Sequence, residues 1–347
     1  MDLVHSLGER LLFAIPKKGR LQLAALDLLS GADIQFRREN RLDIALVKNL
    51  PIALVFLPAA DIPTFVGEGQ CDLGITGLDQ VQEHDAGVRA VARARTLSVD
   101  TGALSDAAAA AAAAAVADGT ATPASKPKGC ETVMELGFGA CKLQVQVPEK
   151  GSYAEPKDLI GKNIGTSFVH LAEEYFARLE QEQDQDGKAV TPRKLRTKII
   201  ELSGSVEAAC ALGVADGIVD LVESGETMRA AGLKPIDTVV ESSAILIKSK
   251  SPSNPELVEL IASRIGGVIT AQKFVLCQYN IPRDRLHDAT AITPGKRAPT
   301  VTALDAANWV AVSAMVEKKK IATVMDNLVK VGATDILVLS IQNTRNS

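Results

Sequence analysis

The chain has 347 residues, 46% of them hydrophobic and 23% charged, with a formal net charge of −4 at pH 7. These values predict a globular protein of roughly two to three domains, and the acidic balance excludes a general nucleic-acid or anionic-membrane binder. The five cysteines form no C-x-x-C pair and the four histidines no H-E-x-x-H, so neither a disulfide scaffold nor a histidine metal site is predicted. The longest apolar runs span 11 residues, which is too short to cross a bilayer. We predict a cytoplasmic protein with no nucleic-acid and no membrane partner.

Strand and helix signals alternate along the first two thirds of the chain. Apolar runs predict strands at Leu11–Ile15, Ile52–Leu57, Cys71–Thr76, Lys142–Val147, Lys162–Ser167, Lys198–Leu202 and Gly217–Val222. Helices are predicted at Leu21–Leu29, at a short segment capped by Asp61 with Pro63 in its first turn, and at Leu171–Leu179, Val206–Leu212 and Thr227–Ala231. This alternation predicts α/β units on parallel sheets, arranged as two lobes with a cleft between them.

The segment Thr101–Gly129 differs from the rest of the chain, because it contains nine consecutive alanines and no aromatic residue. Alanine favours helix, but short isolated helices are marginal in water, and the Gly/Thr/Pro/Ser/Lys tail is typical of a linker. We interpret this segment as a surface insertion that carries no chemistry. The polar stretch Gln181–Lys194 is predicted to be another surface loop.

The C-terminal stretch follows a different order. Strands are predicted at Phe274–Tyr279, Val301–Leu304, Trp309–Val316 and Asp335–Ile341, and helices at Pro282–Ala289 and Lys319–Val331. The order βαββαβ is the ferredoxin-like pattern, and by analogy of fold such a module senses a small ligand. The predicted domains are lobe I at 1–95 and 239–272, an Ala-rich insertion at 96–136, lobe II at 137–238 and a regulatory domain at 273–347.

The sharpest chemical signal is the segment Ile218–Thr227, where an apolar strand ends in acidic residues and a Ser-Gly-x-Thr turn leads into a helix. Such a turn presents backbone N–H groups, two hydroxyls and a helix N-terminus to one point, an arrangement that binds phosphate. Gly225 lets the backbone approach closely, and Asp220 or Glu223 could meet ribose hydroxyls or a magnesium ion. The alternative is an ordinary helix cap on a strand-to-helix turn, and the carboxylate of Glu226 argues against a bound anion.

A second signal is the basic turn Ile15–Leu21, which joins a buried strand to a helix. Residues 17–41 hold six cations against three acids. In an acidic protein such a patch suits a polyanionic small molecule, although a solvated basic face is the plainer interpretation.

Two further turns are weaker candidates, since helix capping explains both. The strand Cys71–Gly77 ends in Thr-Gly, which lets a ligand lie against bare backbone. The turn Ser203–Glu207 joins another strand to a helix. The chain has no G-x-S-x-G, Walker A or dinucleotide fingerprint, so we predict chemistry that depends on positioning and charge.

Seven separated motifs resemble, in this order, those of the long-form ATP phosphoribosyltransferase family of the fungal type: IPKKGRL, RLDIAL, ADIPTFVGEGQCDLGITG, FGACKLQVQVP, LSGSVEAA, DLVESGETMRAAGL and PGKRAPT. The resemblance covers nearly the whole chain except roughly 96–136 and 181–194. It implies an α/β fold with two periplasmic-binding-protein-like lobes around a cleft and a C-terminal ferredoxin-like domain that binds histidine as feedback inhibitor.

The implied reaction joins ATP to phosphoribosyl pyrophosphate (PRPP), giving N1-phosphoribosyl-ATP and diphosphate in the first step of histidine biosynthesis. The resemblance further implies a requirement for Mg²⁺ and a homo-oligomer that ranges from dimer to hexamer. It does not identify the metal ligands.

The resemblance assigns roles to five groups of residues. Ser224, Gly225 and Thr227 would hold the 5′-phosphate, and Asp220 or Glu223 the ribose. Gly204, Ser205 and Glu207 would face the same substrate. Lys17, Gly19, Arg20 and Arg41 would line the nucleotide and diphosphate side. The strand end Asp72, Thr76 and Gly77 is added as a set of substrate contacts on its Thr-Gly pattern, not on the resemblance. Pro294, Gly295, Ala298, Pro299 and Thr300 would lie near the inhibitor.

A rival hypothesis is a non-catalytic small-anion-binding protein of periplasmic-binding-like fold with a ligand-sensing C-terminal domain. A plain amino-acid or sugar binder has no use for a phosphate loop that faces a basic patch, and this difference favours the transferase.

Overall fold

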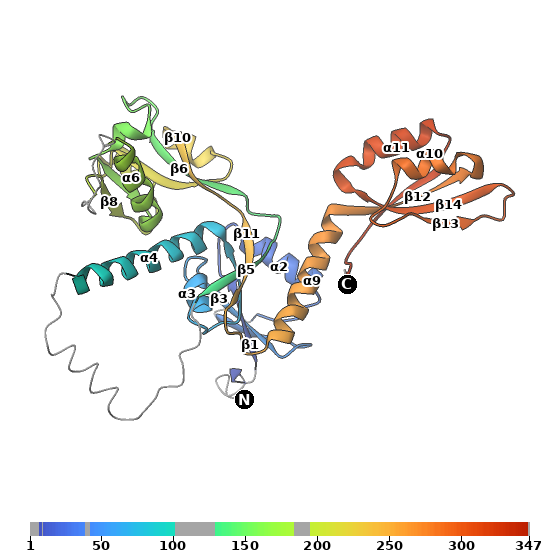
Figure 1. Ribbon diagram of the computed structural model, residues 1–347, viewed down its shortest axis with the longest axis horizontal. Helices are drawn as coiled ribbons and strands as arrows, with labels where there is room; N and C mark the ends of the chain where they lie inside the picture. Colours follow the sequence, from blue (N-terminus) through green and yellow to red (C-terminus); the bar gives the residue numbers. More distant parts are fainter. Residues whose placement is uncertain (1–6, 9, 39–41, 101–128, 184–194, 346–347) are drawn as a thin grey trace. The chain divides into compact units, whose positions relative to one another are not determined.

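The computed structural model describes residues 7–8, 10–38, 42–100, 129–183 and 195–345, apart from the side chains of 94–100 (Figure 1). Most of the predicted Ala-rich insertion and of the predicted loop 181–194 therefore lies outside the described residues. The chain divides into two compact units, the first comprising Met1–Gln22, Asn40–Ile44 and Ile52–Ser253, and the second comprising Leu23–Glu39, Ala45–Pro51 and Asn254–Ser347. Among the described residues, no helix combines the length and apolar character needed to cross a membrane.

The first unit contains two mixed sheets. Five strands of the first sheet are hydrogen-bonded in the order β3-β1-β4-β11-β5, namely β1 (Leu11–Pro16), β3 (Ile52–Leu57), β4 (Leu73–Gly77), β5 (Cys130–Glu135) and β11 (Ala244–Ser249). β1 is parallel to β3 and β4, whereas β11 is antiparallel to β4 and β5. Helix α3 (Ile62–Gly67) packs Ile62 and Val66 against Ala14 and Ile247 of this sheet. Helix α4 (Leu78–Asp100) follows β4 directly.

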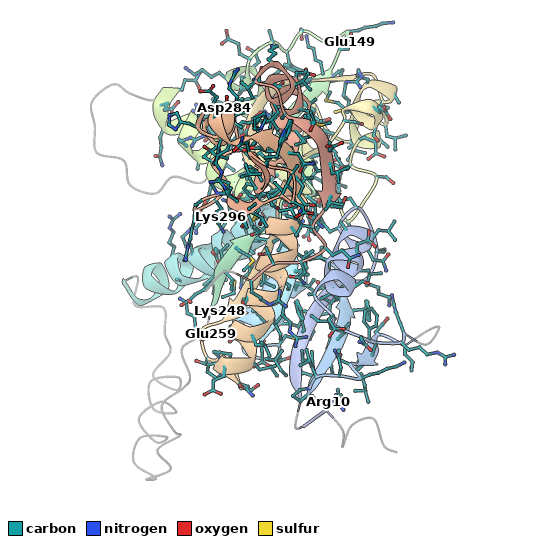
Figure 2. The ribbon with its side chains drawn as sticks, turned by 90° about the vertical axis from the view of Figure 1, so that its right-hand side faces the viewer. Arg10, Glu149, Lys248, Glu259, Asp284 and Lys296 are labelled. Carbon is teal, nitrogen blue, oxygen red and sulfur yellow. The ribbon has the colours of Figure 1, made fainter. Side chains whose placement is uncertain are left out.

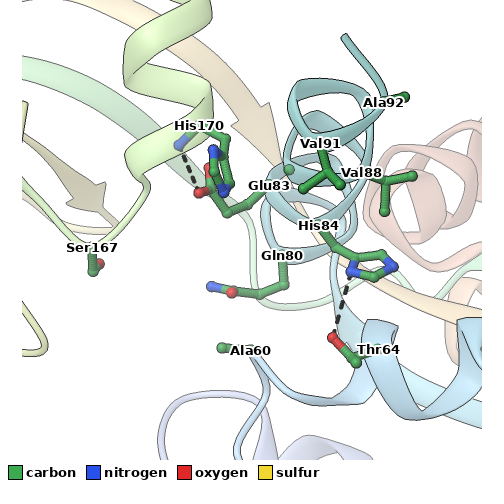
Figure 3. A pocket seen from close by; sticks show the side chains of 11 residues that line it. Ala60, Thr64, Gln80, Glu83, His84, Val88, Val91, Ala92, Ser167 and His170 are labelled. Carbon is green, nitrogen blue, oxygen red and sulfur yellow. Dashed lines mark hydrogen bonds between the residues drawn. The ribbon is translucent and has the colours of Figure 1, made fainter. Parts of the chain in front are cut away.

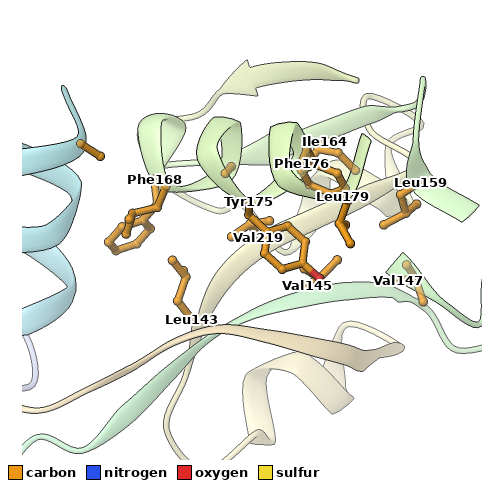
Figure 4. Packing of buried hydrophobic residues seen from close by; sticks show 13 residues of the cluster. Leu143, Val145, Val147, Leu159, Ile164, Phe168, Tyr175, Phe176, Leu179 and Val219 are labelled. Carbon is orange, nitrogen blue, oxygen red and sulfur yellow. The ribbon is translucent and has the colours of Figure 1, made fainter. Parts of the chain in front are cut away.

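The second sheet has the order β10-β6-β9-β7-β8, with β6 (Cys141–Pro148), β7 (Asn163–Thr166), β8 (Lys198–Glu201), β9 (Gly217–Val222) and β10 (Leu233–Ser242). Helix α6 (Val169–Gln183) lays its apolar stripe on this sheet, where Tyr175, Phe176 and Leu179 pack against Val145 and Val219 (Figure 4). Burial of such side chains contributes about 1.5–3 kcal/mol each. The short helices are η1 (Pro156–Leu159), α7 (Ala208–Ala211) and α8 (Glu226–Ala230).

A two-stranded ribbon belongs to both sheets. The chain leaves the first sheet between β5 and β6 and returns between β10 and β11, and these crossings pair with each other. The Leu136 N–H donates to the Ala244 carbonyl at 2.9 Å, and the Ala244 N–H donates to the Phe138 carbonyl at 3.0 Å. On either side, Glu135 pairs with Ile245 and Cys141 with Ser242. The ladder is therefore continuous from one sheet into the other.

The second unit contains helices α2 (Gln22–Gly31, beginning at its boundary) and α9 (Pro255–Lys273), with β2 (Ile44–Leu46) spanning the other boundary. The Asn254 side chain caps α9 by accepting the Leu257 N–H at 3.0 Å. The C-terminal part of the unit contains β12 (Phe274–Pro282), η2 (Arg283–Arg285), α10 (Leu286–Ile292), β13 (Thr300–Ala303), β14 (Trp309–Glu317), η3 (Lys318–Lys320), α11 (Ile321–Lys330) and β15 (Thr334–Ser340). Its antiparallel sheet has the order β13-β14-β12-β15.

The predicted α/β class and the ferredoxin-like βαββαβ order are confirmed by these elements. The prediction of parallel sheets is wrong in part, because the strands that carry the chain between the two sheets run antiparallel to their neighbours. Asp61 stands at the start of α3 but makes no side-chain capping bond, so its predicted capping role is also wrong. Its backbone is already helical there, with φ −84° and ψ −23°, a geometry that does not aim the carboxylate at the first N–H groups. The predicted domain boundaries remain predictions.

Candidate functional site

A cavity of about 260 Å³, which we call the loop cavity, lies where the turn after β9 meets Arg20. The turn contributes the continuous segment Leu221–Met228, and Arg20 and Cys141 complete the wall. Arg20 follows β1, while the turn connects β9 to α8, so the fold brings together two segments that are far apart in the sequence. Two of the strongest predicted signals, the phosphate turn and the basic turn, therefore meet at one site.

The guanidinium of Arg20 is held by groups on three elements. Nη1 donates a short hydrogen bond to the Gly139 carbonyl in the ribbon, and Nη2 donates to the Cys141 Sγ at 3.0 Å. The same Nη2 lies 3.6 Å from Oδ1 of Asp79, at the start of α4. Burial raises the pKa of the Cys141 thiol, and the Arg20 charge opposes this effect in part. Cys141 is therefore a neutral thiol near pH 7, so this wall carries the positive charge of Arg20.

The phosphate turn has an open geometry. Gly225 adopts a left-handed backbone with φ +75°, which permits the sharp entry into α8. The Ser224 hydroxyl oxygen accepts the Glu226 N–H at 3.3 Å, and Arg229 Nη2 donates to the Ser224 carbonyl at 3.1 Å. The Ser224 and Thr227 side chains are exposed toward solvent. They are available to a ligand in the cavity.

The carboxyl group of Asp220 lies at the root of the turn. Its Oδ1 accepts the Leu221 N–H at 2.8 Å. Burial, and secondly the nearby charge of Glu207, raise the pKa of Asp220 to about 6, while the Leu221 hydrogen bond opposes them. The predicted residues Asp220 and Glu207 thus lie close enough to interact. Among the described residues, no group of three or more His, Cys, Asp or Glu side chains could hold a metal ion alone.

The sequence matches two family models and several curated relatives along nearly its whole length. A family model described as ATP phosphoribosyltransferase matches residues 58–125 and 115–267, and one described as HisG, C-terminal domain, matches residues 271–343. The chain belongs to the ATP phosphoribosyltransferase family. The ATP phosphoribosyltransferase of Yarrowia lipolytica is 57% identical over 345 residues, covering 99% of this chain and 100% of that protein. The Saccharomyces cerevisiae relative is 52% identical over 346 residues, with coverage of 99% and 100%.

A solved structure shares the fold. The ATP phosphoribosyl transferase (HisG:HisZ) complex from Thermotoga maritima matches with a TM-score of 0.52 and 20% identity, covering 76% of this chain and 98% of that chain. The predicted family, enzyme class and function are confirmed: the chain is a pentosyltransferase of histidine biosynthesis, whose substrates are ATP and PRPP. The rival hypothesis of a non-catalytic binding protein is set aside.

Other residues predicted from the ATP phosphoribosyltransferase motifs lie outside the loop cavity. Lys17 pairs with Asp43 at 2.7 Å on the surface, and Gly19 beside it has φ +84°. Asp72 accepts the Leu12 N–H at 2.9 Å and also the Ser253 N–H.

Thr76 and Gly77 are buried at the end of β4, where Thr76 donates to the Ala59 carbonyl at 2.7 Å. Gly204 and Ser205 are exposed, and Ser205 has φ +51°. Arg41 lies outside the described residues. The side chains of Asp72 and Thr76 are thus hydrogen-bonded to the main chain. The substrate-binding roles of all these residues stay predictions.

A larger cavity of about 510 Å³ lies between α3, α4 and the start of α6 (Figure 3). Its lining includes His84, whose Nδ1 lies 3.4 Å from the Thr64 hydroxyl. It also includes Glu83, which accepts N–H groups from the first turn of α6. Sequence analysis assigned no role to these residues.

A third cavity, of about 650 Å³, lies in the C-terminal domain. It contains Ala298 and Thr300 from the predicted regulatory segment, together with Lys296 and Arg297; Figure 2 labels Lys296. Ser313, Met315 and Arg345 are also among the lining residues. Gly295 supplies the turn with φ +67°, and a Cβ there would approach the Ala298 carbonyl oxygen to 3.1 Å. Pro294 and Pro299 flank the lining residues without belonging to them.

Sequence analysis missed Asp79, Ser242 and Arg229, which contact the site. Asp79 carried a usable signal, because it is an acidic residue in the first turn of a helix that follows a buried strand. Ser242 carried no sequence signal, because its hydrogen bond to Asp79 joins positions 163 residues apart.

Proposed function

We propose that phosphoribosyl transfer takes place at the loop cavity, with PRPP bound between Arg20 and the turn Glu223–Met228. The observation that carries this proposal is the shared cavity, whose lining combines a cation, two exposed hydroxyls and a glycine turn. The Ser224 and Thr227 hydroxyls and the backbone at Gly225 hold the 5′-phosphate. Gly204, Ser205 and Glu207 face the ribose side, near Asp220.

The charges that develop on the ribose and on the diphosphate during the transfer decide which residues can stabilise the reaction. N1 of adenine attacks C1 of the ribose, the N1–C1 bond forms, and the C1–O bond breaks with its electron pair leaving on diphosphate. Positive charge develops on the sugar and negative charge on the leaving group, so a fixed guanidinium at Arg20 stabilises the transition state. Lys17 and Arg41 supply further positive charge on the nucleotide and diphosphate side. The attacking nitrogen is uncharged, so the step needs no strong general base.

The family is generally metal-dependent, and we assign Mg²⁺ as the ion. Magnesium is held by one or two carboxylates together with substrate phosphates, which suits a site without a cluster of three acids. Glu223 is exposed in the cavity wall and fits such an ion, while Asp220 fits the ribose hydroxyls. When bound, Mg²⁺ neutralises charge on the diphosphate.

Histidine is assigned to the cavity of the C-terminal domain as feedback inhibitor. The cations Lys296 and Arg297 suit its carboxylate, and the cavity volume of about 650 Å³ exceeds what an amino acid requires. We further propose that the protein is a homo-oligomer in equilibrium between dimer and hexamer and that it is cytoplasmic. Light scattering with and without histidine would test the oligomeric state.

The test incubates purified enzyme with ATP, PRPP, Mg²⁺ and a pyrophosphatase, and follows the ultraviolet change of N1-substituted adenine with and without histidine. Product that histidine suppresses supports both the transfer site and the regulatory assignment. For the cavity assignment, Arg297→Ala should raise the histidine concentration for half inhibition, whereas Arg285→Ala, an exposed cation of the same domain paired with Asp288, should not. Product without suppression would remove the regulatory assignment only.

A further inference from the structure

The Asp79 carboxylate is the most completely buried acidic group beside the loop cavity. Its side chain is 1% exposed, against 23% for Arg20. Oδ1 lies 3.6 Å from Arg20 Nη2 and accepts a short hydrogen bond from the Ser242 hydroxyl. Oδ2 accepts Gln80 Nε2 at 3.0 Å. A buried carboxylate is costly unless charge and hydrogen bonds compensate it, and Arg20, Ser242 and Gln80 provide these interactions for Asp79.

The backbone makes room for that carboxylate. A Cβ added at Gly77 would lie 2.1 Å from Asp79 Oδ1, so no side chain fits there. Ser242 accepts the Asp79 N–H at 3.0 Å as well as donating to the carboxylate. Ser242 thus holds both the backbone N–H and the carboxylate of Asp79.

Arg20 is hydrogen-bonded to the same ribbon. Its Nη1 bonds the Gly139 carbonyl, and Gly139 must also be a glycine, because its φ is +65° and a Cβ would lie 2.4 Å from Leu21 Cδ2. Gly139 belongs to one crossing of the ribbon, and Ser242 lies at the start of the other. Arg20 and Asp79 are therefore an ion pair that is bonded to both crossings of the ribbon, and Arg20 also lines the loop cavity.

We propose that Asp79 is a positioning residue for phosphoribosyl transfer, whose carboxylate, anchored by Ser242, fixes the Arg20 guanidinium at the wall of the loop cavity. This inference rests on the proposed role of Arg20 toward the diphosphate. Positioning matters because a displacement of about 1 Å in a catalytic group can cost on the order of 100-fold in rate.

A double-mutant cycle tests the proposal through kcat, the KM for PRPP and the thermal midpoint. Asp79→Asn keeps the shape and removes the charge, and it should lower kcat/KM about tenfold by the positioning argument. Arg20→Ala should lower kcat/KM as well. The double variant should match Arg20→Ala within about twofold, because Asp79 acts through Arg20.

The matched control is Asp85→Asn, an exposed aspartate on the same helix, which should leave all three quantities unchanged. Additive losses in the double variant, with an equal fall of the thermal midpoint in both backgrounds, would show that Asp79 is only structural and overturn the inference. Full activity of Arg20→Ala would instead refute the proposed role of Arg20. Should Asp79→Asn not fold, Ser242→Ala replaces it in the cycle, with the same expected non-additivity.

Discussion

Glu83 on helix α4 caps helix α6 through His170, whose N–H donates to Glu83 Oε1 at 2.8 Å (Figure 3). The second carboxylate oxygen accepts the Leu171 N–H at 2.9 Å. Since α4 extends from the first sheet and α6 packs on the second, this carboxylate links the two sheets of the first unit. It also satisfies two N–H groups that the helix itself leaves unpaired.

Loss of this cap should destabilise the first unit. Glu83→Ala removes two charge-assisted hydrogen bonds from a helix N-terminus, and we expect a loss of about 1–2 kcal/mol in the free energy of unfolding. Urea denaturation measures it. The matched control is Glu174→Ala, which breaks the exposed Arg89–Glu174 pair between the same two helices and should cost less than about 1 kcal/mol. Equal losses in both variants would contradict the capping role.

The role proposed for Arg20 predicts a large kinetic effect. Arg20→Ala removes a charge-assisted contact worth about 1.5–3 kcal/mol, which corresponds to a loss of about 10–150-fold in kcat/KM. Steady-state rates at varied PRPP measure the loss. Lys18→Ala, a neighbouring exposed cation, is the control and should change kcat/KM less than about twofold. Unchanged rates for Arg20→Ala would mean that this guanidinium does not act on the substrate.

Gly225 is predicted to be required for the turn. Its φ is +75°, and a Cβ there would lie 2.8 Å from Arg229 Nη1, so Gly225→Ala should distort the turn and raise the KM for PRPP about tenfold or more. Gly232→Ala is a close control: Gly232 has φ +68° with open space around its Cβ position. That variant should lose stability while keeping its KM. The same KM change in both would indicate a general effect of backbone strain.

Asp220 predicts a specific dependence of stability on pH. Its pKa is near 3.8 in a model compound and about 6 in the folded protein, chiefly because of burial. Between these values the unfolded chain has released the proton while the folded chain retains it, so Asp220 makes the protein less stable as pH rises through this window. The full cost is present above about pH 6.

Asp220→Asn removes that cost. The variant should be more stable than the parent near pH 7, and the gain should shrink as pH falls toward about 4. Denaturant midpoints at several pH values measure this difference. A gain that does not change with pH would contradict the titration of Asp220. If the ionised carboxylate contacts the ribose, activity of the parent should also fall below about pH 6.

Local signals predicted much of the fold. Ile52–Leu57 and Gly217–Val222 are continuous apolar runs that became strands with the same bounds. The strand Leu233–Ser242 escaped prediction because it carries charges and a proline and contains two register irregularities. Helix α9 was obscured by the Gly266–Gly267 pair in its interior, which lowers helix propensity.

The same difference between local and long-range signals applies to the candidate site. The turn at Ser224–Thr227 is local, so its residue pattern was sufficient to find it. The pairing of Asp79 with Ser242 and of Arg20 with Gly139 depends on which strands meet after the chain has crossed twice between sheets. Strand direction at those crossings is a property of the topology, and no periodicity in the sequence encodes it.

The paired crossings also restrict how the two sheets of the first unit can move relative to each other. Two separate linkers could swivel independently, but a hydrogen-bonded ribbon bends as one piece and keeps its register. Any relative movement of the two sheets must therefore bend or twist this ribbon as well as strain the contacts between α4 and α6. The amide protons of Leu136 and Ala244 lie in the hydrogen bonds of this ribbon, so their exchange with solvent would report how often the ribbon opens.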